Sequence, residues 1–440
     1  MTEVSRAPLT HRRVLKTAFP IVLSNATVPI IGLVDTGVVG QLGQAAPIGA
    51  VAVGAVVLTS VYWLFGFLRM GTTGLVSQAH GAGDGDEVAA LLSRALIFAF
   101  GFGGLIIILQ LPLFWAAFHL SPASAEVEML AREYMRIRIL SAPAAIAIYA
   151  MTGWLIALER TRSVLVIQIA MNGLNVVLDL WFVLGLNWGV EGVALATFIA
   201  EWSGAALGLW LCRAAFRGDA WRRVSLVFAQ ARLGRMLSVN TDILLRSLAL
   251  MAIIVSFTFL GAGFGDVTLA ANQVLMLFLN ITAHALDGFA FTAETFIGQA
   301  LGAGARAELR RGVILTSIWG LASVAALALA FGLFGGDIID IMTTSAEVRV
   351  EARGYLVYMV LAPLIGVAAW MLDGIFIGAT RSRDMRNMML LSLLIYAASL
   401  LILLPLFGNH GLWLALLVSY AARGATLAAK YPGLEAAADG

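Results

Sequence analysis

Residues 77–83 read SQAHGAG, and residues 298–304, which lie 221 positions further along the chain, read GQALGAG. Three further matches keep an offset of 219 to 220 positions: Thr161-Arg162-Ser163 with Thr380-Arg381-Ser382, Ala142-Pro143 with Ala362-Pro363, and Gly189-x-x-Gly192 with Gly408-x-x-Gly411. Four matches in one order at nearly one offset are hard to obtain by chance. The chain is therefore predicted to contain two copies of one structural unit.

The composition indicates a membrane protein. Of the 440 residues, 60% are hydrophobic and only 12% are charged, and the mean hydropathy is +0.91. Soluble domains carry about 25% charged residues, so this chain has too little polar surface for a soluble globule of its size. A cytosolic enzyme is thereby excluded, and the single cysteine, Cys212, excludes an intramolecular disulfide and makes a thiolate-ligated metal cluster implausible.

Apolar runs broken by charge or glycine predict twelve spans. A spanning helix needs about 20 apolar residues, and none of the runs alternates as a barrel strand would. The predicted spans cover residues 15–40, 48–70, 91–118, 134–158, 164–186, 190–214, 238–260, 269–296, 311–335, 355–378, 388–407 and 412–429. We expect an all-α polytopic membrane protein with twelve transmembrane helices in two pseudo-symmetric six-helix lobes.

The repeat and the spans together predict the domain organisation. Residues 1–214 form the N-terminal lobe, residues 215–237 a basic cytoplasmic linker, and residues 238–440 the C-terminal lobe. Six spans is an even number, so both lobes have the same orientation, related by an axis along the membrane normal. Two equal lobes around a central cavity suit alternating access by rigid-body rocking.

The distribution of basic residues predicts the orientation. The N-terminal tail and the loops on its side of the membrane hold 22 of the 28 lysines and arginines. The opposite loops hold Arg132, Arg136, Arg138, Arg349 and Arg353, and Arg246 lies inside a span. The positive-inside rule then places both termini in the cytoplasm. The basic N-terminus is expected to be a retained tail rather than a signal peptide.

Ionisable residues inside spans are costly and are therefore functional candidates. In the first span, Asp35 is the only charged residue between Lys16 and Arg69, and Pro20 and Pro29 can kink the same helix. A titratable group on a bendable helix is a plausible proton or cation switch. The alternative is an aspartate that faces water at the mouth of the span.

The fifth and sixth spans add polar groups. One helical face of the fifth span carries Asn172, Asn175 and Asp179. These side chains either bind a small cation or form a network that carries protons, or they join two helices by hydrogen bonds. Thr197 could add a hydroxyl, although a lone threonine in a helix usually bonds its own backbone. Glu201, one turn later, lines the cavity or reaches an interface.

The second half of the chain supplies secondary candidates. Asp242 and Arg246, four residues apart, can neutralise each other or act in function. Asp287 and Glu294 share a face of the eighth span, and Asp373 lies within the tenth. These acids can line a cavity, bind a cation or serve the structure.

Motifs for other functions are weak or absent. The glycine-rich residues 81–85 lack the lysine of a phosphate-binding loop, and neither HExxH nor G-x-S-x-G occurs. Without an ATP motif or a catalytic constellation, transport must draw on an ion gradient. A channel fits the composition, but the duplication and the single buried acids fit a carrier better. The arginine-rich linker favours anionic lipid headgroups over nucleic acid.

The duplicated unit, the Thr-Arg-Ser loops and the Gln-Ala-x-Gly-Ala loops resemble the multidrug and toxic compound extrusion (MATE) family. Three stretches resemble its DinF-type branch: residues 33–36 (LVDT), residues 285–290 (ALDGFA) and residues 372–381 (LDGIFIGATR). The resemblance implies a monomeric, multi-pass antiporter of the bacterial inner membrane. It would export amphipathic, often cationic organic compounds in exchange for protons or sodium ions, with no cofactor. The alternative within the superfamily is a flippase for lipid-linked precursors or polysaccharides.

The resemblance also implies which residues bind the coupling ion. They are Asp35, Asn175, Asp179 and Thr197, with Pro20 as the linked kink. In NorM-type members a glutamate of the seventh span helps to hold sodium, but this chain has Arg246 near that position, which argues against a sodium site in the C-terminal lobe. We favour the proton, because two carboxylates can share protons, whereas sodium needs about five or six oxygen ligands by analogy with calcium.

Overall fold

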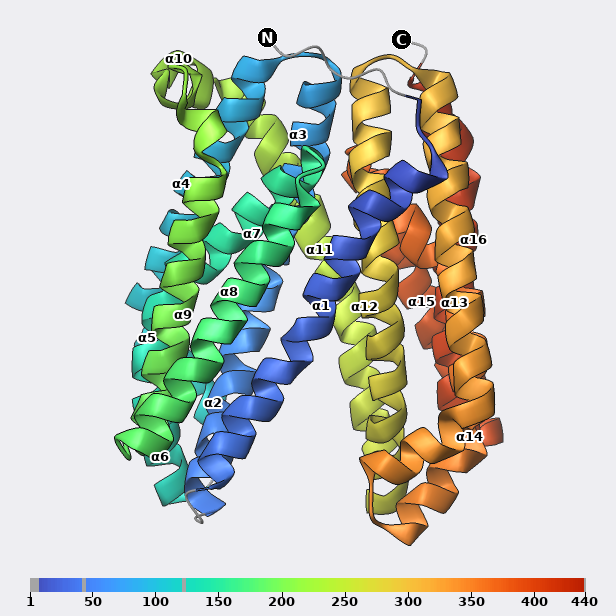
Figure 1. The fold of residues 1–440 in the computed structure, drawn as a ribbon. Coiled ribbons are helices and arrows are strands. Elements are labelled where there is room, and N and C mark those ends of the chain that lie inside the picture. The colour runs from blue at the N-terminus through green and yellow to red at the C-terminus, as the bar shows by residue number, and fades with distance from the viewer. Residues whose placement is uncertain (1–7, 42–44, 121–123, 439–440) are drawn as a thin grey trace. The chain divides into compact units, whose positions relative to one another are not determined.

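The computed structural model describes residues 8–41, 45–120 and 124–438. Every regular element in these ranges is a helix, and the described residues contain no strand (Figure 1). The expected all-α membrane fold is confirmed.

The α-helices of the first half, apart from the 30-residue α1, have between 11 and 24 residues. They are α1 (His11–Gly40), α2 (Ala45–Leu64), α3 (Gly66–Gly81), α4 (Gly85–Ile108), α5 (Gln110–Leu120), α6 (Ala125–Arg138), α7 (Ala142–Ala157), α8 (Thr161–Asp179) and α9 (Gly189–Leu211). The second half begins with the short helix α10 (Val224–Val227). The helices that follow it are longer: α11 (Gln230–Ala262), α12 (Asp266–Gly302), α13 (Arg306–Met342), α14 (Ala346–Gly378), α15 (Ser382–Phe407) and α16 (Asn409–Ala436).

Eleven helical segments of the described chain are long and apolar enough to cross a membrane. Some of these segments join two elements, such as α2 with α3, α6 with α7, and α8 with a π-helical turn over Leu180–Gly185. Helix α1, which has 30 residues and a basic first turn, completes the predicted set of twelve.

Several helices extend beyond the predicted spans. Helix α12 covers Asp266–Gly302 where residues 269–296 are predicted, and α11 begins at Gln230 rather than at residue 238. Hydropathy detects only the part of a helix that lies in hydrocarbon. The hydrogen-bonded helix continues into the polar interface, where apolar residues are no longer required.

Contacts divide the chain into two compact units. The N-terminal unit comprises Leu23–Val76 and Asp84–Met236. The C-terminal unit comprises Leu237–Gly440 together with Met1–Val22 and Ser77–Gly83. The lobe boundaries drawn from the sequence stay a prediction.

In the N-terminal unit, α4 packs against α7, α8 against α9, and α2 against α6. Trp154 of α7 is buried, and its indole Nε1 donates a hydrogen bond of 2.9 Å to the carbonyl of Val88 on α4. The large side chain thereby fills the interface between the two helices without leaving its N–H unpaired.

Arg94 links α4 to the segment that precedes α11, within the same unit. Its side chain is buried, donates to the carbonyls of Val227 at 2.8 Å and Leu226 at 2.9 Å, and pairs with Glu87 at 2.6 Å. Arg232 pairs with the same Glu87. Arg94 is one of the 22 basic residues that the sequence pattern assigns to the N-terminal tail and the loops on its side, but the structure places it inside α4 as a buried residue.

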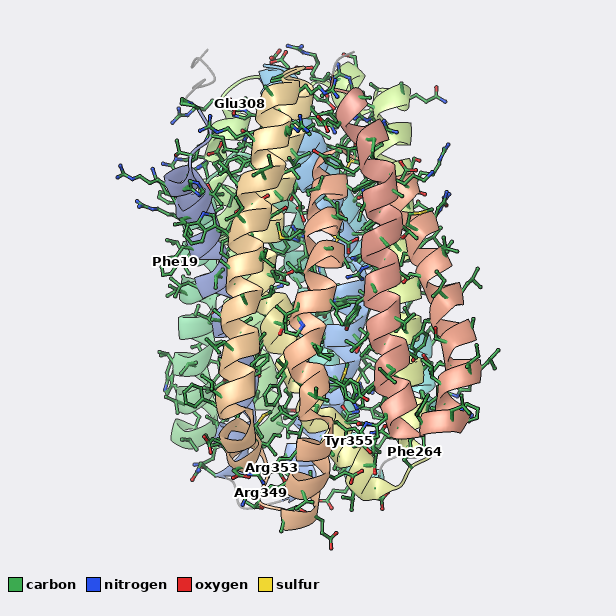
Figure 2. The ribbon with its side chains drawn as sticks, turned by 90° about the vertical axis from the view of Figure 1, so that its right-hand side faces the viewer. Phe19, Phe264, Glu308, Arg349, Arg353 and Tyr355 are labelled. Atoms are coloured by element: carbon green, nitrogen blue, oxygen red, sulfur yellow. The ribbon has the colours of Figure 1, made fainter. Side chains whose placement is uncertain are left out.

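In the C-terminal unit, α14 packs against α12, α13 and α16. A Cβ atom at Gly374 of α14 would lie 2.5 Å from the carbonyl oxygen of Ala290 on α12, so this contact requires glycine. Figure 2 shows Glu308 near one end of this unit, and Arg349 and Arg353 near the opposite end. Both arginines pair there with Asp340, at 3.5 and 2.7 Å.

The repeated motifs pack against one another inside the C-terminal unit. Gly81 of the first copy lies against the backbone of Gln299 in the second, and Gly302 of the second lies against the backbone of Gln78 in the first. Backbone conformation repeats as well, since Gly189 and Gly408 have φ angles of 57° and 56°. These two repeated glycines therefore share a left-handed φ angle as well as their place in the sequence motif.

Candidate ion-coupling site

Two carboxyl groups meet inside the N-terminal unit. Asp35 comes from α1 and is 9% exposed, and Asp179 comes from the last position of α8 and is fully buried. Their carboxyl groups lie close enough to interact electrostatically with one another. The structure thus brings together the two acids that the sequence singled out in this half of the chain.

Asn175 and Thr197 extend this pair toward α9. Asn175 lies one turn before Asp179, and its Nδ2 donates a hydrogen bond of 3.1 Å to Thr197 Oγ1. The hydroxyl of Thr197 in turn donates to the carbonyl of Val193 at 3.0 Å. Thr197 therefore bonds its own helix, as a lone threonine usually does, and also receives the amide of the neighbouring helix.

Four side-chain oxygen atoms of this group lack hydrogen-bond donors within the described part of the chain. Asp35 Oδ1, Asn175 Oδ1 and both carboxylate oxygens of Asp179 are buried and have no hydrogen-bond partner among the described residues. A buried acceptor left unpaired costs about 1–3 kcal/mol, and more when it is charged. The arrangement is thus suited to take up a proton or a cation.

The backbone changes directly after Asp179. Helix α8 ends there, and the chain continues as a π-helical turn over Leu180–Gly185. The amide of Leu186 bonds the carbonyl of Trp181, five residues earlier, at 3.0 Å. Such widened turns are frequent at functional sites, and this one changes the path of the helix next to the buried carboxylate.

Asn172 differs from its neighbours on the same helical face. Its Nδ2 donates to Thr27 Oγ1 on α1 at 2.8 Å, and its Oδ1 accepts from Gln168 at 3.3 Å. Asn172 therefore joins α8 to α1, whereas Asn175 and Asp179 contribute the oxygens without donors. Hydrogen bonding between helices therefore holds for Asn172, and ion binding by Asn175 and Asp179 stays a prediction.

Arg138 belongs to the site region, although the sequence pattern groups it with the loop residues. It lies at the end of α6 and is only 6% exposed. Its Nη1 pairs with Glu201 at 2.7 Å and contacts Ser141 Oγ at 3.1 Å. Its charge acts on both Asp35 and Asp179. The sequence does carry a signal for this position, since the predicted span 134–158 encloses Arg138.

Asp242 and Arg246 of the C-terminal unit have separate partners, so their predicted mutual neutralisation is wrong. Asp242 accepts from Arg386 at 2.6 Å and from Ser382 at 2.9 Å. Arg246 pairs instead with Asp373 of α14. Positions one turn apart can interact, but here α14 and α15 supply the partners, Asp373 and Arg386.

The remaining predicted residues also lie in the C-terminal unit. Glu294 is buried and Asp287 is half-buried, both on α12, and both have interaction partners. Pro20 is buried in α1, which continues as a helix through it.

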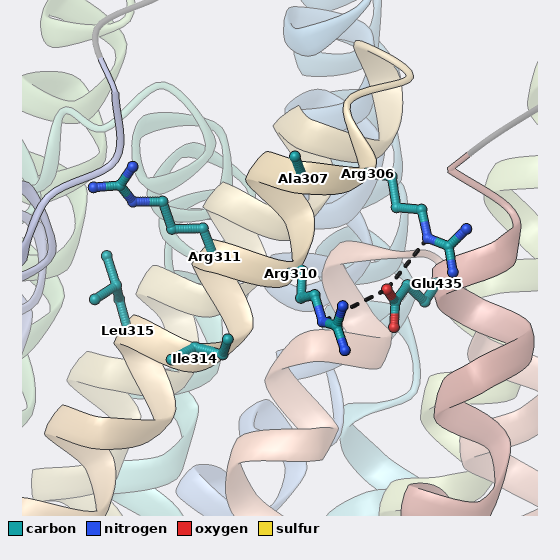
Figure 3. A pocket seen from close by; sticks show the side chains of 7 residues that line it. All are labelled: Arg306, Ala307, Arg310, Arg311, Ile314, Leu315 and Glu435. Atoms are coloured by element: carbon teal, nitrogen blue, oxygen red, sulfur yellow. Dashed lines mark hydrogen bonds and ion pairs between the residues drawn. The ribbon is translucent and has the colours of Figure 1, made fainter.

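The described residues contain no cluster of three or more His, Cys, Asp or Glu side chains arranged to hold a metal ion. A surface pocket of about 570 Å³ lies elsewhere, at the start of α13, and involves no predicted site residue. Figure 3 shows Arg306 and Arg310 in this pocket, both directed toward Glu435 of α16, at 3.2 and 3.9 Å. Below the charged groups the lining is apolar, with Ile314 and Leu315.

The family model described as MatE matches residues 20–181 and 243–402, once in each half of the chain. The chain belongs to the MatE family. The two matched segments contain Asp35, Asn175 and Asp179 in the first and Asp373 in the second.

Curated relatives agree with this assignment. The chain is 41% identical over 420 residues to the DNA damage-inducible protein F of Escherichia coli (strain K12), covering 94% of this chain and 90% of that protein. It is 27% identical over 445 residues to the probable multidrug resistance protein NorM of Deinococcus radiodurans, covering 96% and 94%.

Solved structures share the fold. The Vibrio cholerae MATE transporter VcmN in its bent form matches with a TM-score of 0.87 at 20% identity, over 98% of both chains. A multidrug resistance MATE family transporter in an outward-facing conformation matches with a TM-score of 0.88 at 18% identity, over 97% of this chain and 96% of that chain.

Proposed function

We propose that this MatE protein is a secondary active antiporter that exports amphipathic, often cationic organic compounds in exchange for protons or sodium ions. Family membership, the membrane-spanning helices and relatives named as multidrug resistance proteins support this function. The alternative, a flippase for lipid-linked precursors or polysaccharides, is not favoured by these relatives. The protein works as a carrier rather than as an enzyme, and needs no cofactor besides the coupling ion.

The coupling ion binds at Asp35, Asn175, Asp179 and Thr197. The observation that supports this site is the set of buried oxygens without donors on the first three of these residues. A proton on either acid supplies the missing donor between them, and its release leaves two adjacent carboxylates that repel each other. Loading and unloading of the site therefore changes the interaction between α1 and α8, and Pro20 provides a place where α1 can bend.

The proton is the favoured coupling ion. Sodium would need about five or six oxygen ligands by analogy with calcium, and this site offers that number only with backbone carbonyls or water. A proton needs one acceptor of the right geometry. The pairing of Arg246 with Asp373 also makes Asp373 a poor ligand for a second cation. The other secondary candidates are Glu201, which holds Arg138, and Asp287 and Glu294.

The protein is a multi-pass membrane protein, which we place in the bacterial inner membrane with both termini in the cytoplasm. Residues 1–214 and 238–440 form the two lobes that rock during alternating access, joined by the linker over 215–237. We propose that the protein acts as a monomer. Small organic molecules are its substrates, and anionic lipids contact its basic cytoplasmic side.

Purified protein in liposomes tests both the function and the ion. Efflux of a cationic dye such as ethidium is measured with a proton gradient at equal sodium, and with a sodium gradient at equal pH, while valinomycin and potassium clamp the membrane potential. Proton-driven efflux alone is expected. Efflux driven by the sodium gradient alone would contradict the assignment of the proton as the coupling ion. The absence of efflux with either gradient would contradict the proposed antiporter function.

A further inference from the structure

Three buried charged side chains meet in the C-terminal unit, at a place that the proposed coupling site does not use. They are Arg246 of α11, Asp373 of α14 and Arg423 of α16, which are 7%, 6% and 3% exposed. Arg246 forms an ion pair with Asp373 Oδ2, and Arg423 Nη2 lies 3.8 Å from the same oxygen. The single carboxylate of Asp373 therefore interacts with two guanidinium groups.

The charge of this group is not balanced. Asp373 is the only carboxylate that pairs with either arginine among the described residues. Asp242, one turn before Arg246, is already engaged by Arg386 and Ser382. Two positive charges and one negative charge leave a net charge of +1 inside the unit, and an uncompensated buried charge is strongly destabilising.

Each of the two arginines also has one N–H donor without an acceptor among the described residues. The Nε atoms of Arg246 and Arg423 are buried and have no hydrogen-bond partner within the described ranges. Around Arg423 the surroundings are soft and apolar: Met389 Sδ lies 4.0 Å from Nη1, and the ring of Tyr420 lies 5.9 Å from the guanidinium carbon. The carboxylate or sulfonate of an aromatic or aliphatic molecule matches this combination of excess positive charge, free donors and apolar neighbours.

We propose that Arg246 and Arg423 bind the carboxylate or sulfonate group of an amphipathic substrate. This inference rests on the proposed function as an exporter and widens its substrate class from cationic compounds to anionic ones. Asp373 sets the strength of the site, because it neutralises one of the two arginines and orients both. A small inorganic anion such as chloride has the same charge and is the other possible source of the ligand.

The test uses two dyes that differ only in charge. Dansylglycine carries a carboxylate, and dansylglycinamide carries a neutral amide on the same ring. Binding of each dye to the purified full-length protein in detergent is measured by fluorescence, for the wild type and for Arg423→Gln, Asp373→Asn and Arg383→Gln. Arg383 is an exposed arginine at the start of α15 and serves as the matched control. Size-exclusion elution and melting show which variants are folded.

The wild type and the Arg383→Gln variant are expected to bind dansylglycine about tenfold more tightly than dansylglycinamide. One hydrogen bond to a charged group accounts for a difference of this size. Arg423→Gln should remove this preference, and Asp373→Asn should strengthen it by freeing a guanidinium group. A purely structural cluster predicts weaker binding in both variants, because each disturbs the packing. That result, or equal affinity of the wild type for both dyes, would overturn the proposal.

Replacing gluconate by chloride at constant ionic strength distinguishes the two sources of the anion. Full displacement of dansylglycine by chloride at about 0.1 M would show a site for inorganic anions and overturn the substrate assignment. The binding assay needs no gradient. A failure of gradient-driven efflux in liposomes would therefore overturn the proposed function and leave the binding result standing.

Discussion

The carboxyl groups of Asp35 and Asp179 lie close enough to interact electrostatically, although one belongs to the first helix and the other to the end of α8. Asp179 has no hydrogen-bond donor on either oxygen within the described residues. Two buried carboxyl groups in contact cannot both be ionised without strong repulsion. We therefore expect the two acids to share protons, so that their protons come off in two separate steps that belong to the pair and not to either residue.

Asparagine at either position should abolish coupling, because an amide can fill the space but cannot exchange a proton. We expect Asp35→Asn and Asp179→Asn each to reduce gradient-driven dye efflux to the level of liposomes without protein. Asp219→Asn is the control, since Asp219 is exposed and pairs with Arg223 outside the spans. A wild-type efflux rate in a well-expressed Asp35→Asn variant would contradict the coupling site.

Arg138 and Glu201 should show strong energetic coupling. Removing one member of a buried ion pair leaves an unpaired charge and costs about 3–5 kcal/mol. We expect Arg138→Gln and Glu201→Gln each to lower the free energy of unfolding by about that amount, measured by SDS titration in mixed micelles. The double variant should lose less than the sum of the two. Strict additivity would show that the 2.7 Å contact does not contribute to stability.

Gly302 should tolerate no side chain, because a Cβ atom there would overlap the backbone of Gln78. Backbone cannot rotate away as a side chain can, so Gly302→Ala is expected to lower stability by about 1–3 kcal/mol or more. Gly354→Ala is the matched control: at this helical glycine nothing lies within 4 Å of the position that a methyl group would take, and the variant should gain up to about 1 kcal/mol. Equal melting temperatures of the two variants would contradict the packing of the repeated motifs.

Cys212, which follows the last residue of α9, should be unreactive in the folded protein. Burial raises the pKa of its thiol to about 12, and the thiolate is the reactive form. At pH 7 the group is protonated, and its reactivity should rise only as the pH approaches 12. We expect no maleimide labelling of the native protein at pH 7 and complete labelling in SDS. Rapid native labelling would show that the end of α9 opens.

The pocket at the start of α13 should bind an anionic headgroup. Three of its residues are arginines, and its one carboxylate, Glu435, is shared by two of them. Phosphatidylglycerol should raise the melting temperature of the wild type more than phosphatidylcholine does. The double variant Arg310→Gln/Arg311→Gln should lose this difference, whereas Arg383→Gln should keep it. An unchanged lipid effect in the double variant would place the lipid contact elsewhere.

The sequence by itself determined the class of fold, the spans and the duplication. These properties depend on distances along the chain alone. The length of an apolar run must match the thickness of the hydrocarbon layer, and duplicated motifs keep a constant offset in the sequence. Asp35 and Asp179 could also be singled out, because a carboxylate in an apolar run is costly wherever the run packs. The polar ends of the helices were underestimated, since hydropathy reports only residues in hydrocarbon.

The tertiary structure alone decided the partners of the charged residues. Arg246 could have paired with Asp242 on its own helix, but α14 brings Asp373 to it. The sequence predicts that Arg138 is a loop arginine at the edge of a span, but in the structure it forms an ion pair with Glu201 of α9 inside the unit. The Coulomb energy of two charges is largest at contact and falls in inverse proportion to their separation. The packing of helices distant in the chain, which hydropathy does not encode, therefore determines which charges are neutralised and which remain available to a ligand.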